Sequence, residues 1–222
     1  MIRAVIFDMY ETLVTMTRSV PYKGTNIAKD LGLAESVFRE VWNPSDNERT
    51  LGKTTFEDTI RLSMKVNDCF SESLLQEIIR KRQDAEREYF NHLNPGIIPM
   101  LQGLKERNVK VALISNCYLE ERDVIKQSKL WPYFDVACMS CELGMKKPQI
   151  EIFEICHEKL GLKAEECLYV GDGGSRELET AQAVGMKTVQ AAWYLCEGFG
   201  QPVGRKPEFE QLEKPEDVLG QV

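Results

Sequence analysis

Short apolar runs alternate with segments of helical periodicity along most of this chain, as in proteins built on a parallel sheet. The runs are rich in β-branched side chains, which is typical of strands buried on both faces. The predicted strands are residues 4–7, 109–115, 136–139, 167–170 and 187–191. The helices predicted between them are residues 98–107, 119–128, 150–160 and 177–184. Parallel strands joined by helices require right-handed crossovers, so we predict an α/β fold with a Rossmann-like parallel sheet core.

Residues 15–94 interrupt this alternation, because they contain helical patterns and no predicted strand. Four helices are expected there: one from Ser19 or Pro21 to Gly32, then residues 35–42, a third from residue 54, and residues 71–92. Residues 44–47 (Pro-Ser-Asp-Asn) predict a turn after the second helix. We therefore expect a core of residues 1–14 and 95–222, interrupted by a helical domain at 15–94.

The fourth of these helices is amphipathic in the sequence pattern. The inward stripe is expected to contain Leu74, Ile78, Ala85 and Phe90, and the solvent face Lys81, Arg82 and Arg87. After the last predicted strand, the tail is expected to add an edge strand at residues 209–212 and a short final helix.

Polar residues end three of the apolar strands. Asp8 follows the first strand, Ser115 and Asn116 end the second, and Asp172 follows the fourth after Gly171. In parallel α/β sheets, ligands bind beyond the carboxyl ends of the strands. We therefore expect these side chains to meet at one edge of the sheet.

Four stretches, taken in order, resemble the four sequence motifs of the haloacid dehalogenase-like (HAD) hydrolase superfamily. They are residues 3–13 (RAVIFDMYETL), 109–116 (VKVALISN), 144–148 (GMKKP) and 167–177 (CLYVGDGGSRE). The resemblance covers most of the chain, apart from about eighty residues between the first two motifs. In that family, a helical insertion at this point is a cap that covers the active site.

The resemblance implies a nucleophile and a metal site. Asp8 matches the nucleophilic carboxylate, and a Mg²⁺ ion between Asp8 and Asp172 would relieve the repulsion of two close acids. The main-chain carbonyl of Tyr10 matches a further metal ligand, and Glu177 is expected to act on the metal through water.

The same resemblance assigns the groups that would contact the substrate. Ser115 and Asn116 would donate hydrogen bonds to substrate oxygens, and Lys147 would neutralise charge on nucleophile and substrate. The Gly-x-x-Lys-Pro spacing favours Lys147 over Lys146. Thr12, in the first motif, and the side chain of Tyr10 complete the candidate catalytic set.

Two residues of the first motif depart from the family pattern. Most HAD phosphatases have a second aspartate where this chain has Tyr10, and a phenol is a poor general base at neutral pH. Tyrosine there resembles the 2-haloacid dehalogenase branch, whereas Gly171-Asp172 followed by Glu177 resembles the metal-dependent phosphatases. Glu11 stands where glycine is usual.

Three functions therefore stay open at this stage. The first is Mg²⁺-dependent hydrolysis of a small phosphomonoester through an aspartyl-phosphate at Asp8. The second is metal-independent dehalogenation of a 2-haloacid, and the third is a HAD-fold binding protein whose chemistry is degraded.

Composition narrows the partners. The 222 residues carry a formal net charge of -7, which gives no general attraction to nucleic acid or to anionic membranes. We expect a small-molecule substrate; the oligomeric state is not determined. No basic leader and no apolar stretch of membrane-spanning length is visible, so a cytoplasmic location is expected.

The seven cysteines are an odd set. The C-x-x-C spacing of Cys138 and Cys141 has no second pair and is expected to end a strand rather than open a helix, so we expect reduced thiols and no zinc site.

Overall fold

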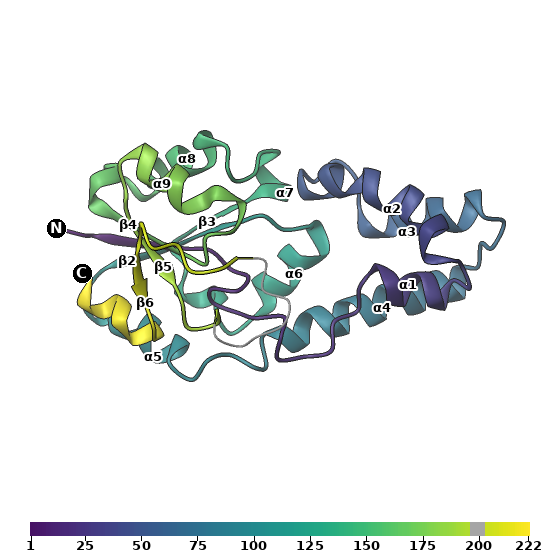
Figure 1. The fold of residues 1–222 in the computed structure, drawn as a ribbon, viewed down its shortest axis with the longest axis horizontal. Coiled ribbons are helices and arrows are strands. Elements are labelled where there is room, and N and C mark those ends of the chain that lie inside the picture. The colour runs from purple at the N-terminus through teal and green to yellow at the C-terminus, as the bar shows by residue number, and fades with distance from the viewer. Residues whose placement is uncertain (196–202) are drawn as a thin grey trace.

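The computed structural model describes residues 1–195 and 203–222, in which a parallel sheet with helices on both faces carries a helical extension (Figure 1). The sheet has six strands in the order β3-β2-β1-β4-β5-β6, and all neighbouring strands are parallel. The strands are β1 (Ala4–Phe7), β2 (Lys110–Ser115), β3 (Val136–Met139), β4 (Cys167–Gly171), β5 (Lys187–Ala191) and β6 (Glu210–Leu212). The predicted α/β fold is confirmed.

Successive residues of the central strand β1 pack into two different hydrophobic cores, because side chains of a strand alternate between its faces. Val5 and Phe7 belong to the core covered by α5 (Ile97–Glu106) and α6 (Leu119–Gln127). Ala4 and Ile6 belong to the core covered by α8 (Ile150–Leu160) and α9 (Glu177–Val184). Both faces of the sheet are therefore buried, which explains why the sequences of its strands are continuous apolar runs.

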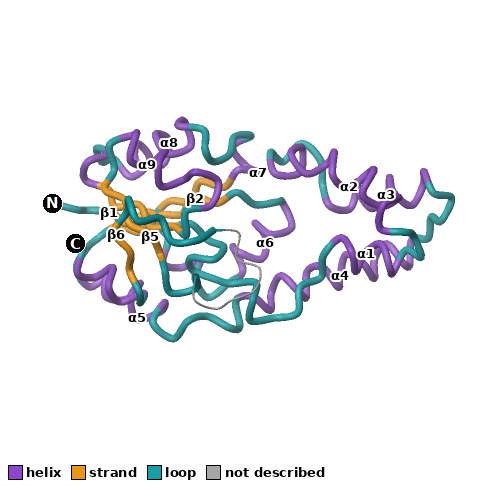
Figure 2. Tube along the Cα trace, in the orientation of Figure 1, coloured by secondary structure: helices purple, strands orange, loops and turns teal. Residues whose placement is uncertain are grey.

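Four helices lie between β1 and α5: α1 (Gly24–Asp30), α2 (Glu35–Thr50), α3 (Phe56–Val66) and α4 (Glu72–Tyr89). We call them the helical insert. They have their own small core, which includes Phe38, Ile60 and Ile78. Figure 2 shows that this region holds helices and loops only, and that the strands lie together at the other end of the molecule. The insert meets the core where α4 packs on α6 and where α2 approaches α7 (Ser140–Leu143).

The second helix of the insert corrects a prediction. Residues 44–47 do not form a turn; Pro44 lies inside α2, which continues to Thr50. Proline lacks the donor for one intrahelical bond and disfavours a helix interior. Packing opposes this local preference, since Arg49 in the last turn is fully buried with its guanidinium between the rings of Trp42 and Tyr118. The first helix also differs, because it begins at Gly24 rather than at Ser19 or Pro21.

The inward face of α4 was predicted only in part: Ile78 and Phe90 are buried as expected, whereas Leu74 and Ala85 are half-buried. Its buried residues are Leu75, Ile78, Arg82, Glu86 and Tyr89. The expected solvent position of Arg82 is wrong, since that residue is 8% exposed. Charged side chains on a helix can be buried when partners from another element neutralise them, and sequence periodicity does not reveal such partners.

Two remaining local predictions can be compared directly with the structure. The C-x-x-C pair does span a strand end and a helix start, contrary to expectation, because Cys138 lies in β3 and Cys141 in α7. The tail forms the edge strand β6 and a final 3₁₀ helix at Pro215–Gly220. Cys196 and the beginning of the tail lie outside the described residues. No helix in the described ranges is long and apolar enough to cross a lipid bilayer.

Candidate active site

The ends of β1 and β4 bring together the two aspartates that the sequence singles out. Phe7 pairs with Val170 in the sheet, so Asp8 and Asp172 both emerge at its carboxyl edge. Glu177, at the start of α9, completes an acidic group whose ligand atoms lie within 4.8 Å of one another. All three carboxylates are buried.

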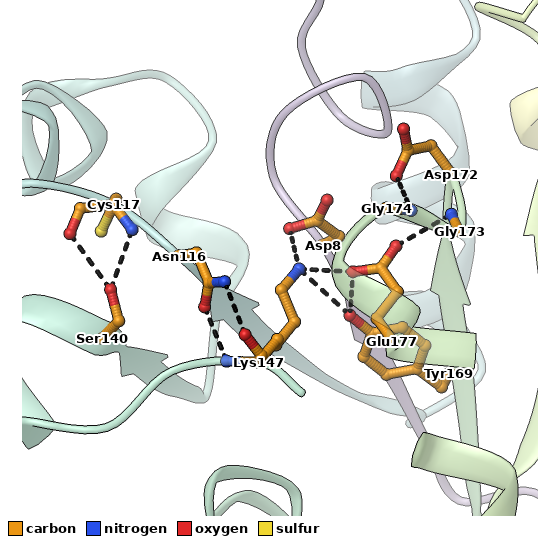
Figure 3. Close-up of polar contacts among 10 residues, drawn as sticks. All are labelled: Asp8, Asn116, Cys117, Ser140, Lys147, Tyr169, Asp172, Gly173, Gly174 and Glu177. Atoms are coloured by element: carbon orange, nitrogen blue, oxygen red, sulfur yellow. Dashed lines mark hydrogen bonds and ion pairs between the residues drawn. The ribbon is translucent and has the colours of Figure 1, made fainter. Parts of the chain in front are cut away.

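Lys147 supplies the positive charge inside this group. Its Nζ donates to Asp8 Oδ1 at 2.6 Å and to Glu177 Oε2, and the lysine is 4% exposed (Figure 3). The Gly-x-x-Lys-Pro segment therefore brings Lys147 to the nucleophile candidate. Lys146 instead lines the neighbouring cavity.

Burial and mutual repulsion shift the pKa values of these groups. Burial, followed by the charge of Glu177, raises the pKa of Asp8 to about 7, although Lys147 opposes the shift. Burial, Glu177 and Asp8 raise the pKa of Asp172 to about 8. Burial disfavours the charged form of Lys147, but Asp8 and Glu177 outweigh it and raise the pKa of Lys147. Lys147 therefore keeps its positive charge, but one ammonium does not neutralise three buried carboxylates.

The residues present fit a hard divalent cation. With all groups ionised, the three carboxylates and one ammonium have a net charge of −2, which one Mg²⁺ ion would balance. Asp172 offers an oxygen, since Oδ1 accepts from Gly174 N at 2.8 Å and Oδ2 has no hydrogen bond from a described residue. Both oxygens of Glu177 are already engaged: Oε2 by Lys147 and Tyr169, and Oε1 by Gly173 N at 3.1 Å. Direct ligands are thus expected from the aspartates, and an indirect role from Glu177.

Asn116 borders the cavity beside the acidic group, and its amide also binds the main chain of Lys147. Its Nδ2 donates to the carbonyl of Lys147 at 3.1 Å, and Lys147 N donates to its Oδ1 at 2.8 Å (Figure 3). We predicted that Asn116 donates to the substrate; in this structure its amide holds the main chain of Lys147. Ser115, at the end of β2, is fully buried and its Oγ has no hydrogen-bond partner among the described residues.

The side chain of Tyr10 extends toward the insert. Burial, Glu121 and Glu86 raise its pKa well above the ordinary value, while Arg82 lowers it. Its hydroxyl is buried without a hydrogen-bond partner among the described residues. A phenol in this environment is a poor acid and a poor base near neutral pH.

The turn after the nucleophile explains the unusual Glu11. This residue adopts φ +58°, in the left-handed region where glycine has no steric cost. Its carboxylate accepts from Thr15 Oγ1 at 2.6 Å and from Met16 N at 3.0 Å. These hydrogen bonds stabilise the left-handed conformation of Glu11, which glycine would adopt without steric cost. Thr12 is buried in the same turn, where its carbonyl accepts from Trp193 Nε1 at 2.8 Å.

Sequence reasoning missed two residues that support the acidic group. Tyr169, in β4, donates its hydroxyl hydrogen to Glu177 Oε2 at 2.9 Å. Gln190, buried in β5, donates from Nε2 to the carbonyl of Asp172 at 2.8 Å. In the sequence, each is a polar residue inside an apolar strand. Because buried polar groups need hydrogen-bond partners, this position could have indicated that both residues contact the site. Gly171 is also required, because a Cβ there would lie 2.1 Å from Glu177 Oε1.

A cavity of about 550 Å³ lies between the insert and the core. The core contributes Tyr10, Asn116, Tyr118 and Lys146, among others. The insert contributes side chains from one face of α2, including Arg39, Trp42 and Asp46, together with Arg82 of α4. A small metabolite of this size range would contact both parts.

Comparison with known proteins identifies the family. The haloacid dehalogenase-like hydrolase family matches residues 2–185. The chain belongs to this family of hydrolases. The fold and the enzyme class predicted from the motifs are thereby confirmed.

Two relatives of this HAD hydrolase are phosphatases of small metabolites. A phosphoglycolate phosphatase from Aquifex aeolicus is 27% identical over 219 residues, covering 98% of this chain and 95% of that protein. A glyceraldehyde 3-phosphate phosphatase from Methanocaldococcus jannaschii is 33% identical over 97 residues, so the match covers 43% of this chain and 42% of that protein.

Two solved structures show the same fold. A HAD family enzyme from Bacteroides thetaiotaomicron, in complex with magnesium and inorganic phosphate, has a TM-score of 0.65 at 19% identity, covering 86% of this chain and 94% of its own. An L-2-haloacid dehalogenase has a TM-score of 0.66 at 20% identity, covering 100% of this chain and 99% of its own. Fold similarity alone therefore does not separate phosphatases from dehalogenases.

Proposed function

We propose that this HAD hydrolase is a Mg²⁺-dependent phosphatase of small phosphomonoesters. The observation that carries the proposal is the buried group of Asp8, Asp172 and Glu177 around Lys147. A metal-free dehalogenase has no need for a site whose ionised groups sum to −2. The metabolite phosphatases among the relatives support the same choice.

In the proposed reaction, a carboxylate oxygen of Asp8 attacks phosphorus while the bond from phosphorus to the ester oxygen breaks, and the leaving alkoxide takes a proton from water to become the alcohol. Water then attacks the aspartyl-phosphate, which releases inorganic phosphate and restores the carboxylate. Lys147 orients Asp8 and balances charge as the phosphoryl group arrives. Asp8, Asp172 and the main-chain carbonyl of Tyr10 would hold Mg²⁺, which would supply positive charge to stabilise the phosphoryl group.

We also propose that residues 15–94 act as a cap on a core of residues 1–14 and 95–222. The cavity shared by both parts supports this arrangement. A cap that closes over the site would exclude bulk water and contact the leaving group. The leaving group is then expected to be a small metabolite, and the acidic chain is not expected to bind nucleic acid.

The test is phosphate release from a panel of phosphate esters, with and without EDTA, by wild type and Asp8→Asn. Wild-type activity that disappears with EDTA and in Asp8→Asn is expected. Turnover that persists in Asp8→Asn would refute the nucleophile. Absence of turnover on every substrate would favour the binding-protein alternative.

A second candidate is 2-haloacid dehalogenation, which Tyr10 favours, because a halide leaves without a proton and needs no acid at that position. Release of chloride from 2-chloropropionate in EDTA would select it. The two chemistries differ in both product and metal requirement, so parallel phosphate and chloride assays decide between them.

A further inference from the structure

Arg82 joins the helical insert to the core. Its Nη2 donates to Glu121 Oε1 of α6 at 2.8 Å, and its Nη1 lies 2.9 Å from Glu86 Oε1 of α4. Nη1 also donates to the carbonyl of Tyr22, just before α1, at 3.1 Å. One buried guanidinium thus ties two parts of the insert to the first turn of a core helix.

Glu121 also binds the main chain just before α6. Its second oxygen, Oε2, accepts from the main-chain N of Tyr118 at 3.0 Å. Burial and Glu86 raise the pKa of Glu121 to about 8, while Arg82 lowers it. Each oxygen of Glu121 therefore has its own partner, Arg82 on Oε1 and the Tyr118 N–H on Oε2.

A second contact from the insert reaches the same place. Tyr118 OH donates to Asp46 Oδ1 of α2 at 2.5 Å, and the guanidinium of Arg49 lies 4.3 Å from the centre of the Tyr118 ring. Helices α2 and α4 thus both dock on residues 118–121. This short stretch is where docking of the insert acts on the core.

The residues just before this stretch hold the candidate catalytic lysine. Cys117 is fixed on both sides by Ser140, whose Oγ accepts from Cys117 N at 3.0 Å and donates to its carbonyl at 3.1 Å (Figure 3). Asn116 binds the main chain of Lys147 through both atoms of its amide, and Lys147 Nζ contacts Asp8. A continuous set of contacts therefore runs from the insert to the nucleophile.

We propose that Arg82 is a positioning residue for Lys147, acting through Glu121 and residues 116–118 to couple docking of the insert to the geometry of the nucleophile. The catalytic part of this inference rests on the proposed phosphatase function. The positioning part concerns the structure alone, so it has a separate readout.

The experiment compares Glu121→Gln, Arg82→Met and Arg82→Lys in the full chain, with p-nitrophenyl phosphate and Mg²⁺. Glutamine keeps the size of Glu121 but has a single acceptor oxygen, so it loses the contact to either Arg82 or Tyr118 N. Arg61→Met is the matched control, because Arg61 pairs with Glu57 and Glu72 within the insert. Misplaced catalytic groups typically cost on the order of 10²-fold in rate.

We expect Glu121→Gln and Arg82→Met to lower kcat by about 10- to 100-fold, because Lys147 loses its support. Arg82 also lines the cavity, but Tyr22, Glu121 and Glu86 engage its terminal nitrogens, so KM should change less than about threefold. Arg82→Lys should recover part of the loss, and Arg61→Met should stay within about twofold of wild type. Combining Arg82→Met with Glu121→Gln should cost no more than the worse single change, because both break one chain of contacts.

Hydrogen exchange supplies the readout that needs no activity. Amides in residues 116–121 and 144–149 should exchange faster in Glu121→Gln and Arg82→Met than in wild type or Arg61→Met. Unchanged exchange in Glu121→Gln would overturn the proposal, as would a rise in KM alone, which would place Arg82 against the substrate. If Arg82→Met does not fold, Glu121→Gln decides. If neither wild type nor any variant hydrolyses phosphate esters, but the variants exchange faster, the structural coupling is retained and the proposed phosphatase function is rejected.

Discussion

Replacing Tyr10 with aspartate is expected to accelerate hydrolysis of alkyl phosphates while changing aryl phosphates little. The wild-type phenol has a raised pKa, owing to burial, Glu121 and Glu86, and it extends toward the insert. A leaving alcohol therefore finds no suitable proton donor at residue 10. An aryl phosphate leaves as a stabilised phenolate and needs none.

The size of the effect follows from the missing proton transfer. General acid catalysis typically contributes roughly 10²–10⁴-fold, which corresponds to about 3–5 kcal/mol of activation free energy. Wild type should therefore prefer p-nitrophenyl phosphate to an alkyl phosphate by a margin of this order beyond their intrinsic difference. Tyr10→Asp should narrow that margin by at least about tenfold, if its carboxyl group reaches the leaving oxygen.

The assay measures kcat/KM for both ester classes in wild type, Tyr10→Asp and Tyr10→Asn. Asparagine matches the size of aspartate but has no proton to give, so it isolates the acid from the change in shape. Equal wild-type rates on the two esters, or equal gains in Tyr10→Asp and Tyr10→Asn, would refute this account of Tyr10. Mg²⁺ affinity should stay close to wild type, because the proposed ligand at this position is the main-chain carbonyl.

Further predictions concern the lysines, the metal and pH. Lys147→Met should lower kcat by on the order of 10²-fold or more, because Lys147 contacts Asp8, while Lys146→Met should change it only a few-fold in the same assay. Asp172→Asn should abolish Mg²⁺ binding measured by calorimetry, and an unchanged isotherm would remove Asp172 from the site. The folded-state pKa values of about 7 for Asp8 and about 8 for Asp172 exceed the ordinary value, so the folded protein binds more protons than the unfolded chain between about pH 4 and pH 8. The melting temperature of the metal-free protein should therefore fall as pH rises through this window. Mg²⁺ should raise the melting temperature more at pH 8 than at pH 5. A melting temperature in EDTA that rises with pH would contradict the assigned pKa shifts.

The sequence alone was sufficient for the sheet and for the position of its polar ends. Strands buried on both faces produce continuous apolar runs, so β1, β2 and β4 could be recognised locally, and parallel topology then required Asp8 and Asp172 to share an edge. The spacing of the Gly-x-x-Lys-Pro segment favoured Lys147, and the structure places Lys147 against Asp8. These features depend on patterns within a few residues, and such patterns survive without knowledge of the partner elements.

Only the tertiary structure decided what the polar side chains contact. Arg82 reads as a solvent-exposed residue by helical periodicity, yet Glu121, 39 positions away, neutralises it in a buried site. The amide of Asn116 binds the main chain of Lys147, 31 positions away, and the sequence motif alone does not reveal this contact. A turn was expected at Pro44, but helix α2 continues through it to Thr50, and Arg49 in the last turn packs against Trp42 and Tyr118. In each case contacts between segments decide the outcome, and a single sequence does not contain the distances that determine which contact forms.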